Sequence, residues 1–245
     1  MSPKPLKLLE GAIFLSDAHY SFKHKELFGF LKAVATQQIR TPQLILMGDI
    51  FDLLFGGIPY TVERNSEAVD LINTLSDNIE IVYLEGNHDF NLAPIFPGVK
   101  IFSIQEQPVA CDYKGQPVAL AHGDFDAPFG YRFYTAIIRN PYLLRFLSLL
   151  DTVGRHFIIN ALDTKLLRKN DCVKMDTFES YVVSHLSQQD LSRYTLFIEG
   201  HHHQDCAFTV DGCRYVNLPA FACGLGYMRF GANGLERVTF ASEEV

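Results

Sequence analysis

The chain has 245 residues, 48% of them hydrophobic and 20% charged, and its formal net charge is −7. This is enough material for one globular domain with an insertion. The acidic balance argues against binding along the phosphates of nucleic acids, so no nucleic-acid partner is expected. No apolar run approaches the roughly 18 residues of a membrane-spanning helix, and we expect a cytoplasmic protein without a cleaved signal.

Charge and cysteines are both unevenly placed. Residues 131–174 hold eight lysines or arginines and three aspartates, a local balance of +5, which leaves −12 for the remainder of the chain. The cysteines are odd in number, scattered and never arranged as CxxC, so neither a disulfide framework nor a zinc knuckle is expected. We expect buried free thiols at Cys111, Cys172, Cys206, Cys213 and Cys223.

Short apolar segments alternate with segments of helical periodicity through most of the chain. Apolar residues recur at helical spacing over 25–38 and 62–75. Five other segments are typical of buried strands, and each ends where a polar residue appears. This alternation of strand and helix predicts an α/β core. The predicted strands cover 12–15, 44–47, 79–84, 118–121 and 195–198.

The C-terminal part of the chain changes character. Strands are predicted over 206–210, 214–217 and 237–240, and the turn signals Asp-Gly, Ala-Cys-Gly and Asn-Gly join them. This pattern indicates a second, more antiparallel sheet.

Residues 125–191 form a long block of helical character that a simple crossover between strands does not require. We interpret this block as an inserted helical cap within a single domain that spans residues 1–245. Asn140 followed by Pro141 predicts the start of a helix, and Asp176 and Glu179 have the spacing of a capping box. Several short helices are therefore expected.

Polar residues follow each of the five predicted strands, at the end where open α/β sheets bind ligands. Taken alone, an Asp-x-His pair fits a surface loop, an Asp after a strand fits a turn, and a His triplet fits a metal-sticky surface tract. Five strand ends that all carry ligand-type residues favour a metal site. In an extended segment, Asp17 and His19 would point the same way and share one ion.

The ordered set D-x-H, G-D-x-x-D, G-N-H-D, a strand-end His and G-H-x-H resembles the calcineurin-like metallophosphoesterase superfamily. Every element occurs in order between Asp17 and His203. The resemblance implies an α/β fold, a four-layer β-sandwich flanked by helices, with the helical cap inserted. His202 is the variable position of the last motif and is not expected to be a ligand. The implied shells are Asp17, His19, Asp49 and His203 for one metal, and Asp49, Asn87, His122 and His201 for the other, with Asp49 bridging.

Histidine and carboxylate ligands in mixture suit two divalent transition-metal ions, with Mn favoured and Fe, Zn or Co as alternatives. Two such ions leave a positive well for phosphate, and a water that bridges them loses its proton near neutral pH and becomes the nucleophile. His88 is not needed in either shell, so it is predicted to hydrogen-bond a phosphoryl oxygen or to protonate the leaving oxygen. Asp89 or Asp52 is predicted to orient its imidazole.

Three cap arginines, Arg132, Arg139 and Arg145, lie in an apolar and aromatic run. The run fits an ordinary buried helix with solvated arginines, or a site for a polar-headed lipid, because acyl chains need an apolar channel and phosphates pair with arginine. Such an insertion directly after His-Gly-Asp resembles the UDP-2,3-diacylglucosamine diphosphatase family of lipid A synthesis. The resemblance implies that an acylated UDP-sugar is cleaved to UMP and 2,3-diacylglucosamine 1-phosphate, at the cytoplasmic face of the inner membrane.

Members of that diphosphatase family tend to carry Arg where this chain has His88, the residue of the wider superfamily. A phosphatase or phosphodiesterase that acts on another nucleotide diphosphate or phosphodiester is therefore the alternative. A non-catalytic scaffold is a third interpretation, but it predicts broken ligand sets, and all seven predicted ligands are present.

Overall fold

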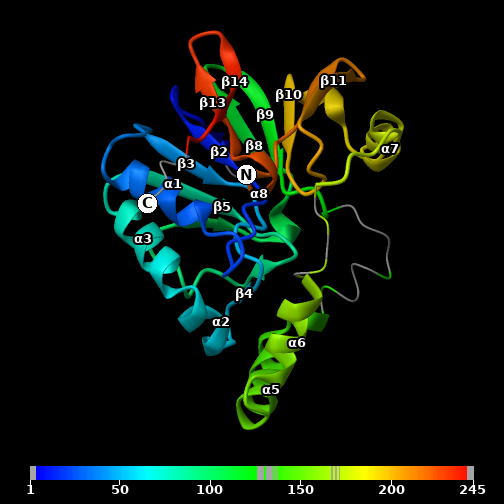
Figure 1. Cartoon of the computed structure of the whole chain (residues 1–245). Helices are drawn as coiled ribbons and strands as arrows, with labels where there is room; N and C mark the ends of the chain where they lie inside the picture. The colour runs from blue at the N-terminus through cyan, green and yellow to red at the C-terminus, as the bar shows by residue number, and fades with distance from the viewer. Residues whose placement is uncertain are drawn as a thin grey trace.

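The computed structural model describes residues 4–125, 130, 135, 137–166, 168, 170 and 172–241. Two six-stranded mixed sheets lie at one end of the molecule, and two helices of the expected cap extend away at the other (Figure 1). No helix in these ranges is both long enough and apolar enough to cross a membrane.

The first sheet joins four parallel strands to a C-terminal hairpin. The strands β2, β3, β5 and β7 are parallel, and β13 is antiparallel to both β2 and β14. Phe14 pairs with Ile45, and Ile45 with Val82, so apolar side chains form a row across the sheet. The order across the sheet is β14 (Gly234–Thr239), β13 (Gly226–Gly231), β2 (Ile13–Leu15), β3 (Gln43–Leu46), β5 (Glu80–Leu84) and β7 (Lys100–Phe102).

The second sheet has a parallel centre, β9, β10 and β12, between two antiparallel pairs, β8 with β9 and β11 with β12. The predicted second sheet contains the strands expected over 206–210 and 214–217, but the strand expected over 237–240 belongs to the first sheet as part of β14. One C-terminal hairpin completes each large sheet, because it covers a strand edge that would otherwise be open. The order is β1 (Leu6–Lys7), β8 (Val109–Tyr113), β9 (Gln116–Ala121), β10 (Leu196–Glu199), β12 (Cys213–Asn217) and β11 (Cys206–Val210).

Helices cover the outer faces of both sheets and complete four layers. Alternate residues of a strand point to opposite faces, so Ile13 packs with α1 (Glu26–Ala35) and α3 (Ser66–Ser76), whereas Phe14 packs between the sheets. On the far side, α7 (Phe178–His185) packs against the outer face of the second sheet. The predicted four-layer α/β sandwich is confirmed.

The predicted helix over 62–75 is two helices, α2 (Pro59–Arg64) and α3, with Asn65 between them. The buried Asn65 amide donates hydrogen bonds to the carbonyls of Leu53 at 2.9 Å and Thr61 at 2.8 Å. A side chain that satisfies nearby carbonyls competes with the helical pattern at this position. The break was not visible in the apolar spacing, which continues through both helices.

Several short elements connect the large ones. The loops after β3 and β5 pair with each other as a small parallel ribbon, which carries Phe55 and Phe90 toward the cap. These elements are β4 (Leu54–Phe55), β6 (Asp89–Phe90), α8 (Phe221–Gly224) and the 3₁₀ helices η1 (Ile104–Glu106) and η2 (Leu191–Arg193).

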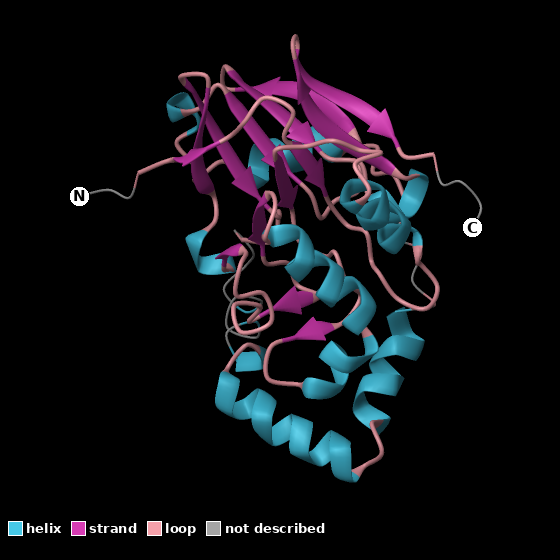
Figure 2. Cartoon of the chain, turned by 90° about the vertical axis from the view of Figure 1, so that its left-hand side faces the viewer, coloured by secondary structure: helices cyan, strands magenta, loops and turns pink. Residues whose placement is uncertain are grey.

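The two cap helices, α5 (Pro141–Val153) and α6 (Phe157–Leu166), stand away from the sheets (Figure 2). The predicted helix start at Asn140 is confirmed, since its side chain accepts two N–H groups of the first turn at 3.0 and 3.1 Å. The buried carboxylate of Asp151 accepts the N–H of Ile158 at 2.8 Å and so fixes the start of α6. Polar caps at both starts define the turn between the helices.

The cap rests on the core through α2 and a small apolar cluster. Arg64 forms an ion pair with Asp163 of α6 at 2.6 Å. The ring of Tyr60 stacks on that of His156, with 3.6 Å between the centroids. The apolar cluster comprises Leu53, Phe55, Ile58, Phe90, Leu144 and Ile159.

The end of the expected cap segment belongs to the sheet layers. The predicted capping box at Asp176 and Glu179 is wrong, because Thr177 precedes α7 and its side chain makes no capping hydrogen bond. Phe178 and Val182 pack against the second sheet, so α7 lies apart from α5 and α6.

A disulfide joins Cys172, in the segment that leaves the cap, to Cys223 of α8. The expectation of buried free thiols is therefore wrong for this pair and holds for Cys111 and Cys213, whereas Cys206 is free but only half-buried. The two cysteines are 51 residues apart, and only the fold brings their segments together. Close by, Lys174 Nζ donates to the carbonyls of His203 at 2.8 Å and Gln204 at 2.7 Å.

The packing predicts a large difference between two Leu→Ala substitutions. Leu44 is fully buried in β3, whereas Leu149 of α5 is 62% exposed. Leu44→Ala should lower the free energy of unfolding by about 2–5 kcal/mol, and Leu149→Ala by less than about 0.5 kcal/mol. Urea denaturation followed by circular dichroism measures both, and equal losses would contradict the layer arrangement.

Candidate metal centre

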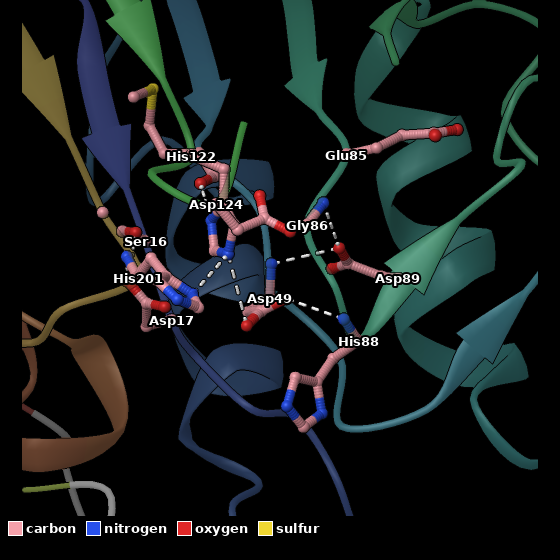
Figure 3. Close-up of polar contacts among 12 residues, drawn as sticks. Ser16, Asp17, Asp49, Glu85, Gly86, His88, Asp89, His122, Asp124 and His201 are labelled. Carbon is pink, nitrogen blue, oxygen red and sulfur yellow. Dashed lines mark hydrogen bonds and ion pairs between the residues drawn. The ribbon is translucent and has the colours of Figure 1, made fainter. Parts of the chain in front are cut away.

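Parallel strands from both sheets end at one region, where Asp17, Asp49, His122 and His201 lie close together (Figure 3). The first sheet supplies three of the loops that carry the predicted ligands and the second supplies two. The arrangement brings together residues that are far apart in the sequence. Asp17 and His19 follow β2, Asp49 follows β3, Asn87 follows β5, His122 follows β9, and His201 and His203 follow β10.

Asp17, His19 and His203 form a first cluster, whose potential ligand atoms all lie within 4.8 Å of one another. His203 Nε2 is 3.1 Å from Asp17 Oδ1. His19 Nδ1 is 3.0 Å from the carboxylate of Asp52, which accepts its proton and leaves the lone pair on Nε2. That Nε2 is buried and has no hydrogen-bond partner among the described residues. A histidine that ligates a metal is held in this way by a carboxylate behind it.

Asp49, His122 and His201 form a second cluster of the same kind. His122 Nε2 lies 3.3 Å from Asp49 Oδ2 and 3.2 Å from His201 Nδ1. His122 Nδ1 donates to the carbonyl of Met47 at 2.8 Å, so its Nε2 is the nitrogen that can bind an ion once its proton is released. Two imidazole nitrogens at this separation match neighbouring ligands of one ion with bonds of about 2.1 Å.

The amide oxygen of Asn87 is also buried without a partner in the described part of the chain. Orphaned ligand atoms of Asn87 and His19, beside mixed imidazole and carboxylate donors, fit divalent ions better than a purely hydrogen-bonded site. Asp49 Oδ1 accepts the N–H of His88 at 2.8 Å, while its Oδ2 faces His122. The bridging role of Asp49 and the division into two four-residue shells stay predictions.

Most of the predicted ligands have a left-handed backbone, which residues other than glycine rarely adopt. The expectation that Asp17 and His19 share an extended segment is therefore wrong. They lie in an irregular segment after β2, held where their N–H groups donate to the carbonyls of Gly48 and Asp49, each at 3.1 Å. The φ values are 51° for Asp17, 47° for His19, 51° for Asp49, 62° for His201 and 57° for His203.

The predicted role of Asp89 beside His88 is wrong. Its carboxylate is fully buried and points away from the His88 ring, accepting N–H groups from the loop that follows β3 and from Gly86. The Tyr83 hydroxyl donates to it at 2.6 Å. Asp89 is therefore a positioning residue for the ligand loops.

Asp52 contacts His88 through its backbone. The Asp52 carbonyl accepts the Nδ1 proton of His88 at 2.9 Å, and its carboxylate is engaged with His19 instead. The rings of His19 and His88 meet edge to face, 5.2 Å between centroids. His88 thus has one ring nitrogen fixed and Nε2 available for chemistry.

The predicted cap arginines differ in position. Arg139 is buried, and its Nη2 donates to the carbonyl of Gly86 at 2.8 Å, so it reaches the loop that carries Asn87. Arg145 is exposed on α5. Arg132 lies outside the described residues.

Two further residues support the ligand loops, and their roles could not be predicted from the sequence. Gln107 accepts the N–H of His122 at 2.6 Å and donates to the carbonyl of Glu85 at 2.9 Å, so it links two ligand loops. Gly86 lies so close to the metal centre that a Cβ there would be 2.2 Å from Asp49 Oδ1. A glycine in a G-N-H-D motif can be read from sequence, but the partner that requires it cannot.

Burial and neighbouring charges raise the pKa of some histidines in the two clusters and lower that of another. Burial opposes protonation of His19, but its hydrogen bond to Asp52 and nearby carboxylates prevail and raise its pKa to about 9. Against the same penalty, Asp49 raises the pKa of His122 well above its ordinary value. Burial, with the charge of His122, holds the pKa of His201 well below its ordinary value. In the metal-free protein, protons on His19 and His122 therefore balance the buried carboxylates.

Facing sheets between helices, with buried histidine and carboxylate clusters at the strand ends, suit a metal-dependent hydrolase, and the sequence relatives are named as hydrolases. Named relatives in sequence resemble this chain over most of its length. UDP-2,3-diacylglucosamine hydrolase of Salmonella arizonae is 23% identical over 219 residues, which cover 87% of this chain and 89% of that protein. The protein of the same name from Salmonella newport is 22% identical with the same coverage.

No family model matches the chain. Among solved structures, the phosphoesterase Yfce of E. coli aligns with a TM-score of 0.46 and 14% identity, over 93% of this chain and 92% of that one. The resemblance to the UDP-2,3-diacylglucosamine diphosphatase family, which the sequence indicates, is confirmed by the sequence relatives.

Gly86→Ala should abolish tight metal binding, because the new methyl group would displace the Asp49 carboxylate. Gly224→Ala is the matched control, since a Cβ at Gly224 would meet nothing within 4 Å. Metal content after loading and desalting, measured by mass spectrometry, should fall only in the first variant. Equal metal contents in the two variants would show that this close approach does not matter.

Metal binding should release protons, because an ion takes the lone pairs that protons occupy on His19 and His122. Affinity should therefore rise with pH up to about 9, by roughly tenfold per pH unit for each proton released. Calorimetric titration in buffers of different ionisation enthalpy measures the proton count. Heats that do not depend on the buffer would refute this charge balance.

Proposed function

We propose that the chain hydrolyses the diphosphate bond of UDP-2,3-diacylglucosamine and releases UMP and 2,3-diacylglucosamine 1-phosphate. The observation that carries this proposal is a largely apolar cavity of about 320 Å³ that adjoins Asn87 and His88 and is bounded by both cap helices. Its apolar wall includes Leu53, Phe55, Phe90, Leu144, Leu147 and Leu162.

The cavity has a polar end beside the metal centre. Arg139 lines it together with Asn87 and His88, and its Nε and Nη1 are buried without hydrogen-bond partners among the described residues. Its guanidinium lies over the ring of Phe90, 5.2 Å from the centroid. Free N–H donors suit phosphate oxygens, and the leucine-rich remainder suits acyl chains. The cavity therefore favours a substrate with both parts.

The sequence relatives support the same substrate. Both bear the name UDP-2,3-diacylglucosamine hydrolase, and the similarity spans 87% of the chain, so it is not confined to the ligand motifs. A phosphodiesterase for small nucleotides would leave the apolar wall of the cavity unused. Comparing turnover of an acylated and a small substrate distinguishes such a phosphodiesterase from the proposed enzyme.

The residues divide the chemistry between them. Two divalent ions, which we propose to be Mn²⁺, would polarise the phosphoryl group and lower the pKa of the attacking water. Because His88 Nδ1 already donates to Asp52, Nε2 is the free nitrogen, and it can donate a proton only from the imidazolium form. His88 then serves as the general acid for the leaving oxygen. Arg139 orients the phosphate from the cap side.

Peripheral association with a membrane surface would follow from this substrate. The cap exposes large apolar side chains at Tyr142, Phe146, Val153 and Phe157. The surrounding segment 131–174 carries the local charge balance of +5. Apolar side chains with basic neighbours suit the surface of an anionic bilayer.

The direct test compares two substrates with the metal-loaded protein. We expect release of UMP from UDP-2,3-diacylglucosamine, and a much lower kcat/KM for bis(p-nitrophenyl) phosphate. Leu147→Arg, which places a charge in the cavity wall, should raise KM for the acylated substrate only. Turnover of the small phosphodiester without turnover of the acylated nucleotide would favour the general phosphodiesterase.

His88→Ala should lower kcat by about 10²–10⁴-fold, the range for loss of a general acid, and leave the metal content intact. His24→Ala, which removes a histidine outside both clusters, is the control and should change neither quantity. Metal analysis and steady-state kinetics on the same samples check this. Loss of metal together with activity would identify His88 as a ligand instead.

A further inference from the structure

A group of potential ligands that shares no residue with the metal centre lies behind the loop that carries His201 and His203. His185 of α7, Glu199 at the end of β10 and His202 offer ligand atoms that all lie within 4.8 Å of one another. The ring of His202 lies between His201 and α7, with its centroid 4.9 Å from that of His201 and 5.8 Å from that of His185. The group draws on three elements that only the fold brings together.

Glu199 anchors this group as a fully buried carboxylate. Its Oε2 accepts the hydroxyl of Tyr215 at 2.7 Å, and its Oε1 lies 3.2 Å from His185 Nε2. Only 5% of the His185 side chain is exposed. One carboxylate oxygen is thus fixed by Tyr215, and the other is directed toward the imidazoles.

The ion pair between His185 and Glu199 does not account for the buried position of His202. Its Nε2 is buried and has no hydrogen-bond partner among the described residues. The rings of Phe178 and Tyr181 lie 5.3 and 5.2 Å from its ring, between centroids, so apolar surface surrounds it. A buried polar atom left unpaired costs about 1–3 kcal/mol. A hydrogen bond between His185 and Glu199 would satisfy those two residues and leave this cost in place.

We propose that His185, Glu199 and His202 bind a further divalent ion of the Zn²⁺ class, separate from the dinuclear centre. Two imidazoles and one carboxylate are a set that zinc takes when a water fills its fourth position. The ion would satisfy His202 Nε2 and offset the buried charge of Glu199. It would also tie α7 and β10 to the loop that presents His201 and His203. This site does not depend on the proposed substrate.

Ion counting tests the proposal without any assay of activity. The protein is stripped of metal, loaded with Zn²⁺ or Co²⁺, desalted and analysed for metal per chain. The unchanged protein should hold one equivalent more than either Glu199→Gln or His202→Phe. His202→Phe keeps an aromatic ring against Phe178 and Tyr181, so it removes the ligand with little change in packing.

A second set of variants, in which the dinuclear centre is disabled, tests whether this ion binds independently of that centre. Asp49→Asn and His122→Ala together should empty the dinuclear centre and leave one Co²⁺ per chain, with the visible absorption of a tetrahedral site. Adding His202→Phe should remove that ion, whereas adding His24→Ala should not. Circular dichroism confirms that each variant is folded. Equal metal content with and without His202→Phe, in either background, would overturn the proposal.

Discussion

The buried carboxylate of Asp89 is the interaction on which the geometry of the metal centre depends. It accepts the N–H groups of Asp49 and Gly86, each at 3.0 Å, and of Ile50 at 2.6 Å, together with the hydroxyl of Tyr83. One side chain therefore binds the loops after β3 and β5 to each other. Each buried donor would cost about 1–3 kcal/mol if left unpaired, so separating the two loops would carry a large free-energy penalty. This fixes the approach of Asp49 to the G-N-H-D turn, and the other strand ends converge on the same point.

The metal centre concentrates unfavourable features that the surrounding layers must offset. Left-handed backbone at a ligand such as Asp17 or His201 costs of order 1–3 kcal/mol, and buried carboxylates and imidazoles lose hydration. Apolar clusters lie on both faces of each sheet and hold the strand ends in place. In exchange, the strained backbone holds the ligand side chains in position toward one region. Little reorganisation is therefore needed when an ion or a phosphate binds.

Much of this arrangement could be predicted from sequence, and the failures share a cause. Buried parallel strands are continuous apolar runs, so β3 and β5 were visible, and the polar residues that end them marked the site. Asp89 was assigned to His88 because the two are adjacent, but adjacent residues entering a strand point to opposite sides, and Asp89 begins β6. The break at Asn65 and the disulfide of Cys172 depend on distant partners. The pairing of Glu199 with His185 of α7 also depends on a distant partner, and no local sequence pattern predicts it.

The way the cap is joined to the core bears on how such a protein can diversify. The chain enters the cap after β9 and returns through a segment that Lys174 and the disulfide fasten beside His203, while the strand ends that carry the ligands stay in the sandwich. An exchange of α5 and α6 would therefore reshape the wall of the cavity that we propose to hold the substrate, and would leave the candidate metal ligands in place. New specificities can evolve by replacing one exterior module, without passing through intermediates that have lost the hydrolytic core.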